Sequence, residues 1–293
     1  MSIASLLSRF AGQMLARVAS RRSPVWALER DGRTLLLAGT MHLVRGVDLP
    51  LPRRYERAFA SARCVAFETD LEAFGEPSFA RSLSARLAYP QGDHLEHHLD
   101  GETLAALRGH LEDKGLDFDA MRGFRPSYVA LSLGMAALRS QGFDTPLDLL
   151  FHRRARAQGK RLVALEAVDR QVETLLEMDR VAPDAVIRQA IEEDVQAAAL
   201  ASASVRAMRQ GDLAALEAIE RPLRDRYPLL HQALLVARNR EWLPALEGLL
   251  EHPGPRLAMV GALHLVGPEG LLALLADRGF EVRPYRGAAR DHR

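Results

Sequence analysis

The sequence predicts an α/β fold, with a central mixed β-sheet made of two pseudo-symmetric strand–helix–strand halves that are flanked by helices. The main observation is a segment near the start, residues 35–44 (LLLAGTMHLV), whose pattern returns near the end as residues 257–266 (LAMVGALHLV). Each copy is an apolar run of strand length followed by Gly, two residues and His. Apolar runs without alternation are typical of strands buried on both faces. A helical pattern and another strand follow each copy, and a long helical stretch, about residues 183–252, predicts an insertion between the halves.

The first half predicts a hairpin, a helix and a strand in that order. Two apolar runs separated by Asp31-Gly32 predict a hairpin, because this dipeptide suits a two-residue turn. The second run ends at the first Gly-x-x-His. A helical pattern over residues 53–62 then leads to an apolar strand, residues 64–67, which ends at Glu68.

Residues 76–125 have a polar and mostly helical pattern. They include His94-Leu-Glu-His97-His98, which invites a metal-site interpretation. The glutamate lies between the histidines, however, so the segment does not match H-E-x-x-H. We therefore interpret it as a hydrated surface helix.

A second carboxylate follows a second strand. A helical pattern from Asp148 to Ala157 precedes the strand 161–165, which ends at Glu166 and resembles the strand that ends at Glu68. For either glutamate alone, a salt bridge or a charge at a helix N-terminus is an equally good interpretation. After the helical insertion and the second Gly-x-x-His, a helix and a strand over residues 280–285 complete the chain.

The predicted domain organisation has three parts: an N-terminal helix (1–23), a single domain (24–286) and a basic tail (287–293). The first 28 residues contain no acid and carry apolar residues at helical spacing, which predicts a basic amphipathic helix. Arg9 interrupts the apolar core that a secretory signal needs, so we expect a cytoplasmic or membrane-peripheral protein, with the periplasm as the alternative. This helix either packs on its own domain or gives peripheral membrane contact through residues 1–22.

Composition excludes several functional classes. The 293 residues are 48% hydrophobic and 26% charged, as in ordinary soluble globular proteins. The 39 basic and 38 acidic residues nearly balance, so we expect no nucleic-acid partner. The single cysteine, Cys64, excludes an internal disulfide framework and a thiolate zinc site, and we expect it to be a buried apolar residue. A Walker-type loop and a Gly-x-Ser-x-Gly elbow are both missing from the sequence.

Two histidines and a carboxylate at strand ends suit a catalytic divalent metal, provided that the strands converge in one sheet. Imidazole and carboxylate without thiolate are compatible with zinc, manganese, cobalt or iron. Such a metal lowers the pKa of bound water and polarises a carbonyl group. The second carboxylate is then a candidate general base, and an arginine and an asparagine are candidates to hold the developing oxyanion.

Six motifs, in this order over residues 24–286, resemble the TraB/GumN family: Gly39-Thr-Met-His42, Phe67-Glu68-Thr-Asp70, Arg125-Pro126, Leu165-Glu166 with Gln171, Arg238-Asn239 with Trp242, and Gly261-Ala-Leu-His264-Leu-Val-Gly267. The resemblance implies the fold shared by Tiki proteases, erythromycin esterases and haem-binding ChaN-like proteins. It also implies a manganese- or cobalt-dependent peptidase site.

Carried over residue by residue, the resemblance makes His42, His264 and Glu68 the metal group. Glu68, Arg238 and Asn239 are then the catalytic group, to which the strand-end carboxylate Glu166 is added. Two departures from the family are visible: no recognisable signal peptide, and Pro146-Leu-Asp148 where members often have Gly-x-Asp.

The resulting prediction is a hydrolase dependent on a divalent metal (Mn, Co or Zn) that cleaves peptide bonds with a metal-activated water. The alternatives are a non-catalytic protein that binds a peptide signal, haem or another tetrapyrrole, and an esterase for small molecules. The expected partner is therefore a peptide or small-molecule substrate. The sequence leaves the oligomeric state open.

Overall fold

A computed structural model describes residues 22–287, and a six-stranded mixed sheet lies at its centre. Its strands are β1 (Val25–Arg30), β2 (Arg33–Thr40), β4 (Cys64–Phe67), β6 (Arg161–Ala164), β7 (Arg256–Gly261) and β8 (Glu281–Pro284), in the spatial order β6-β4-β7-β2-β1-β8. The four strands from β6 to β2 are parallel, and β1 is antiparallel to both of its neighbours. The two Gly-x-x-His strands, β2 and β7, are therefore adjacent at the centre of the sheet.

The predicted hairpin between β1 and β2 is confirmed. Arg30 pairs with Arg33, so Asp31 and Gly32 form a two-residue loop, and their φ angles are 51° and 69°. Positive φ at both positions gives the loop a twist that matches that of the strands. An Asp-Gly pair adopts this conformation at low cost, since glycine has no Cβ and aspartate tolerates the left-handed region.

Two strand–helix–strand units start from the central pair of strands. From β2 the chain passes through α2 (Arg53–Ser61) to β4, on the far side of β7. From β7 it passes through α12 (Leu271–Asp277) to β8, at the opposite edge of the sheet. The units thus run in opposite directions from neighbouring strands, and the predicted α/β fold class is confirmed.

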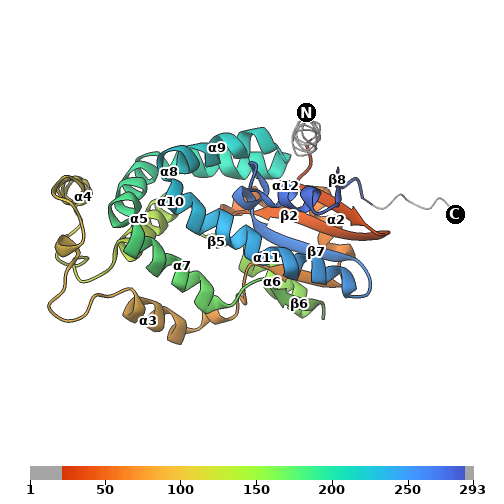
Figure 1. Cartoon of the computed structure of the whole chain (residues 1–293), viewed down its shortest axis with the longest axis horizontal. Helices are drawn as coiled ribbons and strands as arrows, with labels where there is room; N and C mark the ends of the chain where they lie inside the picture. The colour runs from red at the N-terminus through yellow and green to blue at the C-terminus, as the bar shows by residue number, and fades with distance from the viewer. Residues whose placement is uncertain (1–21, 288–293) are drawn as a thin grey trace, which may run out of the picture.

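Two short strands, β3 (Leu43–Val44) and β5 (Thr145–Pro146), pair with each other outside this sheet, and the remaining elements of the described chain are helices. They are α3 (Pro77–Arg86), α4 (Gly101–Asp113), α5 (Pro126–Ser140), α6 (Leu147–Ala157), α7 (Val168–Val181), α8 (Pro183–Gln210), α9 (Leu213–Arg226), α10 (Pro228–His231) and α11 (Ala237–Gly248). Short 3₁₀ helices are η1 (Gly46–Asp48), η2 (Ala73–Gly75), η3 (Leu95–His97), η5 (Leu249–Glu251) and η6 (Ala262–Leu265), and η4 (Gln232–Val236) is a π-helix. In Figure 1 the strands lie at one end of the molecule and α4 at the other, with α5, α7 and α8 between them.

The long helical stretch consists of α8 to η5; it breaks after α8 and after α9, and α10, η4, α11 and η5 follow one another without interruption. Gly211, at φ 64°, ends α8 in the left-handed conformation, and the Asp212 side chain caps α9 by accepting a hydrogen bond from Ala215 N at 3.1 Å. Helix α8 packs along α5 and α9, whereas α11 packs against α12 beside the sheet.

The His94–His98 segment differs from the expected surface helix. Only Leu95–His97 is helical, as a single 3₁₀ turn. The Asp93 carboxylate accepts hydrogen bonds from His94 N at 2.9 Å and from the rings of His97 and His98 at 3.0 and 2.9 Å. Side-chain bonds of this kind compete with the helical backbone pattern, which explains the difference.

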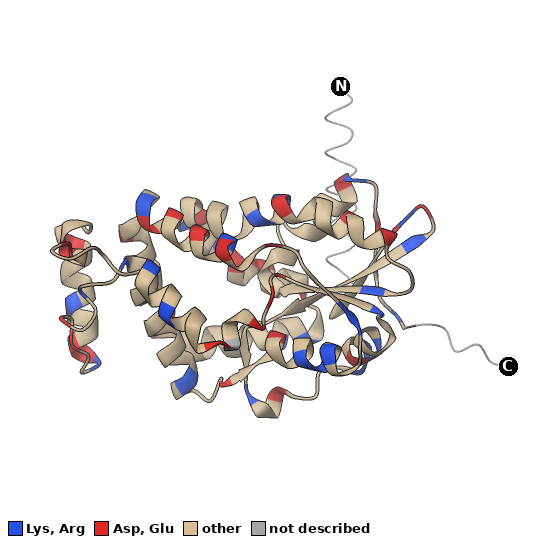
Figure 2. Cartoon of the chain, turned by 90° about the horizontal axis from the view of Figure 1, so that it is seen from below, with Lys and Arg blue, Asp and Glu red and all other residues tan. Residues whose placement is uncertain are grey.

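The core lies around the central strands. Trp26, Tyr55, Phe59 and Phe67 are almost fully buried there, and Cys64 is buried among them as predicted. In Figure 2 the positions of Lys and Arg and those of Asp and Glu are interspersed along the helices. Among residues 22–287, no helix combines the length and apolar character needed to cross a bilayer.

The domain boundaries at the two ends of the chain stay predictions. The expected N-terminal amphipathic helix, with its membrane contact, lies almost entirely outside the described residues. The same is true of the basic tail, apart from Gly287.

Candidate functional site

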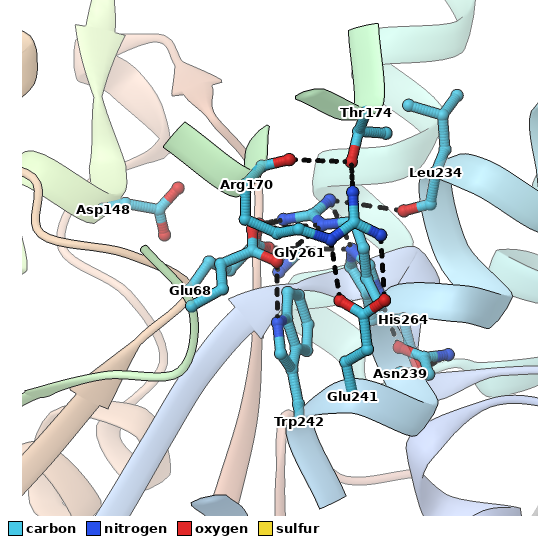
Figure 3. Close-up of polar contacts among 12 residues, drawn as sticks. Glu68, Asp148, Arg170, Thr174, Leu234, Asn239, Glu241, Trp242, Gly261 and His264 are labelled. Carbon is cyan, nitrogen blue, oxygen red and sulfur yellow. Dashed lines mark hydrogen bonds and ion pairs between the residues drawn. The ribbon is translucent and has the colours of Figure 1, made fainter. Parts of the chain in front are cut away.

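The carboxyl ends of the four parallel strands lie on the same side of the sheet, and most of the predicted site residues lie there. Glu68 follows β4 directly and Glu166 lies two residues beyond β6, and Glu166 N donates a hydrogen bond to Glu68 O at 2.9 Å. His264 lies in η6, immediately after β7, and His42 lies two residues after β2. Both copies of the repeat thus end on the same side of the sheet, and Figure 3 shows Glu68, Gly261 and His264 close together there.

Glu68 is held through both of its carboxylate oxygens. Oε1 accepts a hydrogen bond from Gly261 N at 2.7 Å, and Oε2 accepts one from Arg238 Nη2 at 2.6 Å. Burial alone would raise the pKa of Glu68, but His264, Arg238, His42 and the Gly261 N–H together lower it to about 2. Glu68 is therefore an ionised, buried carboxylate at neutral pH.

The glycines of the two Gly-x-x-His segments serve close packing. A Cβ on Gly261 would lie 3.2 Å from Glu68 Oε1, so glycine lets the carboxylate approach the backbone N–H. A Cβ on Gly39 would lie 3.0 Å from the Cβ of Ala262, so glycine lets η6 pack on β2. Both glycines are explained by space and neither by a positive φ.

Arg238 connects the two strand-end glutamates. Its Nη2 lies 2.6 Å from Glu68 Oε2 and 2.6 Å from Glu166 Oε1, and its Nε donates to Glu166 Oε1 at 3.1 Å. Trp242 Nε1 donates to Glu166 Oε2 at 3.0 Å, and the Arg238 guanidinium lies over the Trp242 ring. Both Glu166 oxygens are thus occupied. This favours the salt-bridge interpretation, in which Glu166 positions Arg238, and a general-base role for Glu166 stays a prediction.

His264 is buried and held in one tautomer. Its Nδ1 lies 2.7 Å from Asn239 Oδ1, while Asn239 Nδ2 donates to Glu269 O at 2.8 Å. Nδ1 therefore carries the proton, and Nε2, with its lone pair, lies 3.8 Å from Glu68 Oε1. Burial lowers the pKa of His264 to about 3, so the ring is neutral. Asn239 acts here by orienting His264, and its predicted oxyanion role is untested.

His42 differs from His264 in exposure and charge. Its side chain is 80% exposed against 5% for His264, and its Nδ1 lies 3.3 Å from Asp148 Oδ2. The Asp148 hydrogen bond, assisted by the charges of Asp148 and Glu68, raises the pKa of His42 to about 9. The sequence analysis did not include Asp148 in the predicted site. Its position, where members of the family often have the aspartate of Gly-x-Asp, could have indicated that it belongs there.

The donor types fit a divalent metal, but their arrangement is not that of a finished metal site. Both imidazoles have an acceptor at Nδ1, the usual arrangement of metal-ligating histidines, which leaves Nε2 to ligate. Arg238, however, donates to Glu68 Oε2 and has its Nη1 3.4 Å from His264 Nε2. No group of three or more His, Cys, Asp or Glu side chains within residues 22–287 is arranged to hold an ion. The metal stays a prediction.

Comparison with known proteins identifies the family. No curated protein and no solved structure gives a significant match. The model of the TraB/PrgY/gumN family matches residues 24–284, nearly the whole chain, and this match covers both Gly-x-x-His segments, both strand-end glutamates and the Arg238–Trp242 segment. The chain therefore belongs to the TraB/PrgY/gumN family.

Proposed function

We propose that this chain is a divalent-metal-dependent hydrolase that cleaves peptide bonds. His42, Glu68 and His264 are the residues that would hold the metal. The observation that carries the proposal is the state of His264, a buried neutral imidazole whose Nδ1–H is held by Asn239 and whose Nε2 lies 3.8 Å from an ionised Glu68. A histidine with only a structural role does not require this combination.

A divalent ion bound by this group would polarise the scissile carbonyl and make a water molecule acidic enough to attack it. The chain's own residues have three tasks. Glu68 supplies a carboxylate that stays ionised at neutral pH. Asn239 holds His264 in the ligating tautomer. Arg238 supplies a buried positive charge beside Glu68, where it can stabilise negative charge that develops on the substrate.

Arg238 also competes with a cation for the same lone pairs, since it contacts both Glu68 and His264. Glu166 and Trp242 hold the guanidinium group on its other side. The balance between these contacts sets how strongly the site binds a metal. For this reason the test measures metal binding and hydrolysis separately.

The test uses a peptide library and calorimetric titration of manganese, cobalt and zinc, with and without a chelator. We expect chelator-sensitive cleavage by the parent, and at least tenfold weaker metal binding by His264→Ala and His42→Ala. Glu68→Gln should lose cleavage. His97→Ala is the control. It removes an exposed histidine in η3, which is not one of the elements of this site, and should leave metal binding and cleavage at the level of the parent.

Three outcomes would overturn the proposal. The first is metal binding that is unchanged in both histidine variants. The second is cleavage that persists with chelator, which would point to a metal-independent esterase or peptidase. The third is no turnover with any metal, which would favour a binding protein; a Soret band on adding haem would then identify a tetrapyrrole site.

A further inference from the structure

A second arginine lies at the outer side of the Glu166–Arg238–Trp242 group. Arg170, in the first turn of α7, donates from Nε and Nη2 to the two oxygens of Glu241 at 2.8 and 2.9 Å. Its Nη1 donates to Thr174 Oγ1 at 2.8 Å. Figure 3 shows this guanidinium joined to both Glu241 oxygens and to Thr174. Glu241 lies one turn after Arg238 on α11.

Exposure increases along this set of charges. The side chains of Glu166 and Arg238 are almost buried, at 4% and 10% exposed. Those of Arg170 and Glu241 are 27% and 48% exposed. The Arg170–Glu241 pair therefore forms the solvent-facing end of a charged network whose buried end is the candidate catalytic group.

The two members of the outer pair differ in their further contacts. Arg170 keeps its orientation through the buried Thr174 hydroxyl, which itself donates to Arg170 O at 3.0 Å. The hydrogen bonds and charge of Glu241, with the charges of Glu166 and Glu177, raise the pKa of Arg170. For the Glu241 carboxylate, every side-chain hydrogen bond found among residues 22–287 comes from Arg170. Glu241 can therefore rotate into solvent while Arg170 stays in place.

We propose that Arg170 binds a free carboxylate of the substrate and that the Glu241 carboxylate occupies this position when no substrate is bound. A planar guanidinium with two parallel N–H groups is the side chain best suited to a carboxylate. This inference rests on the proposed hydrolase function and narrows it. The substrate class is a peptide, or an N-acylated amino acid, with an unblocked carboxyl terminus.

The spacing indicates a scissile bond near that terminus. Residues one turn apart on a helix have Cβ atoms about 5–6 Å apart, so the Glu241 position lies close to Arg238. An extended peptide advances about 3.3 Å per residue. A carboxylate held by Arg170 in place of Glu241 would thus lie near Arg238, which favours a scissile bond within the last few residues of the substrate.

The alternative is that Arg170 and Glu241 only link α7 to α11, as an ordinary surface ion pair does. A purely structural pair predicts lower stability on mutation but no discrimination between carboxylate and amide ligands. The experiment therefore measures that discrimination directly. It uses binding without added metal, so that its outcome is independent of turnover.

The test is calorimetric titration of the full chain with N-acetyl dipeptides that end either in a free acid or in the matching amide. We expect the parent to bind the acids about tenfold more tightly than the amides, as a charge-assisted pair allows. Arg170→Gln should abolish the preference and Arg170→Lys should weaken it. Glu241→Gln should tighten binding of the acids, because it removes the competing carboxylate.

Glu247→Gln is the matched control. Glu247 lies on the same helix and pairs with Arg278 and Arg30, outside this network. Its loss should leave the acid-to-amide ratio unchanged. Equal binding of acids and amides, no binding of either, or a preference that survives Arg170→Gln would overturn the inference. Chelator-sensitive cleavage of amide-capped peptides as fast as of the free acids would also overturn the inference, while it would support the hydrolase proposal. Acid-selective binding without any turnover would support the inference and count against the hydrolase proposal.

Discussion

Replacing Gly261 by alanine tests the packing around Glu68 without changing any charge. The backbone of Gly261 has φ −51° and ψ 135°, a conformation that alanine adopts readily, so no backbone strain is expected. The added Cβ would lie 3.2 Å from Glu68 Oε1 and 3.4 Å from His264 Cδ2. Because Gly261 N and Arg238 hold both Glu68 oxygens, the carboxylate cannot move away without lengthening a hydrogen bond.

The expected effect is a loss of about 1–3 kcal/mol in the free energy of unfolding. Overpacking typically costs about 1–3 kcal/mol, and a weakened hydrogen bond to a charged group adds to this cost. The smaller entropy of the unfolded alanine chain offsets about 0.4–1 kcal/mol. Urea unfolding followed by circular dichroism measures the difference.

Gly134→Ala is the control for this prediction. Gly134 lies in α5, and a Cβ built there meets no atom within 4 Å. The substitution should therefore stabilise the protein by about 0.5–1 kcal/mol through helix propensity. If Gly261→Ala is as stable as the parent while Gly134→Ala behaves as expected, the packing argument is refuted.

Three further predictions concern buried or paired charges. Asp148→Asn should lower the pKa of His42 from about 9 towards the usual value of about 6.5, because the Asp148 hydrogen bond is the main cause of the raised value; an NMR titration that shows no change would contradict this. Burial raises the pKa of Asp179 to about 6, against the opposing Ser127 donors, so the folded state binds the proton more tightly than the unfolded state does. The free energy of unfolding should therefore fall by about 3 kcal/mol as pH rises from about 4 to 6 and stay level above that range. Urea unfolding across this range should show a much smaller fall for Asp179→Asn. Glu166→Gln should cost about 1–3 kcal/mol by leaving Arg238 incompletely paired, whereas an unchanged urea midpoint would argue against a positioning role.

Much of the fold was predictable because local chemistry and tertiary structure agree. Asp31-Gly32 specifies its turn through backbone conformation alone, and the apolar runs that end at Glu68 and Glu166 are strands. These local patterns do not predict the order of the strands in the sheet. Strand β7 inserts between β2 and β4, whose paired residues lie 221 and 192 positions away from it (Leu35 and Cys64 with Arg256), and no local signal encodes such neighbours.

The sequence predicted which residues form the candidate site better than it predicted what each of them does. Both Gly-x-x-His segments end in His-Leu-Val, yet the chain after Gly39 stays extended and forms β3 (Leu43–Val44), whereas the chain after Gly261 winds into η6. What separates them is tertiary: β3 pairs with β5 (Thr145–Pro146), and η6 packs over Gly39. The shared Gly-x-x-His-Leu-Val pattern does not predict that difference.

This divergence has a chemical consequence, because it gives the two histidines opposite states. His264 is enclosed, neutral and fixed by Asn239, while His42 is exposed and charged beside Asp148. A symmetric pair of buried imidazoles would place two identical ligands beside Glu68. The observed pair instead combines a fixed imidazole with one whose affinity for a proton depends on Asp148. Under the proposed function, Asp148 therefore governs how easily His42 gives up its proton to join Glu68 and His264. This role explains why a residue outside the two repeated segments belongs to the site.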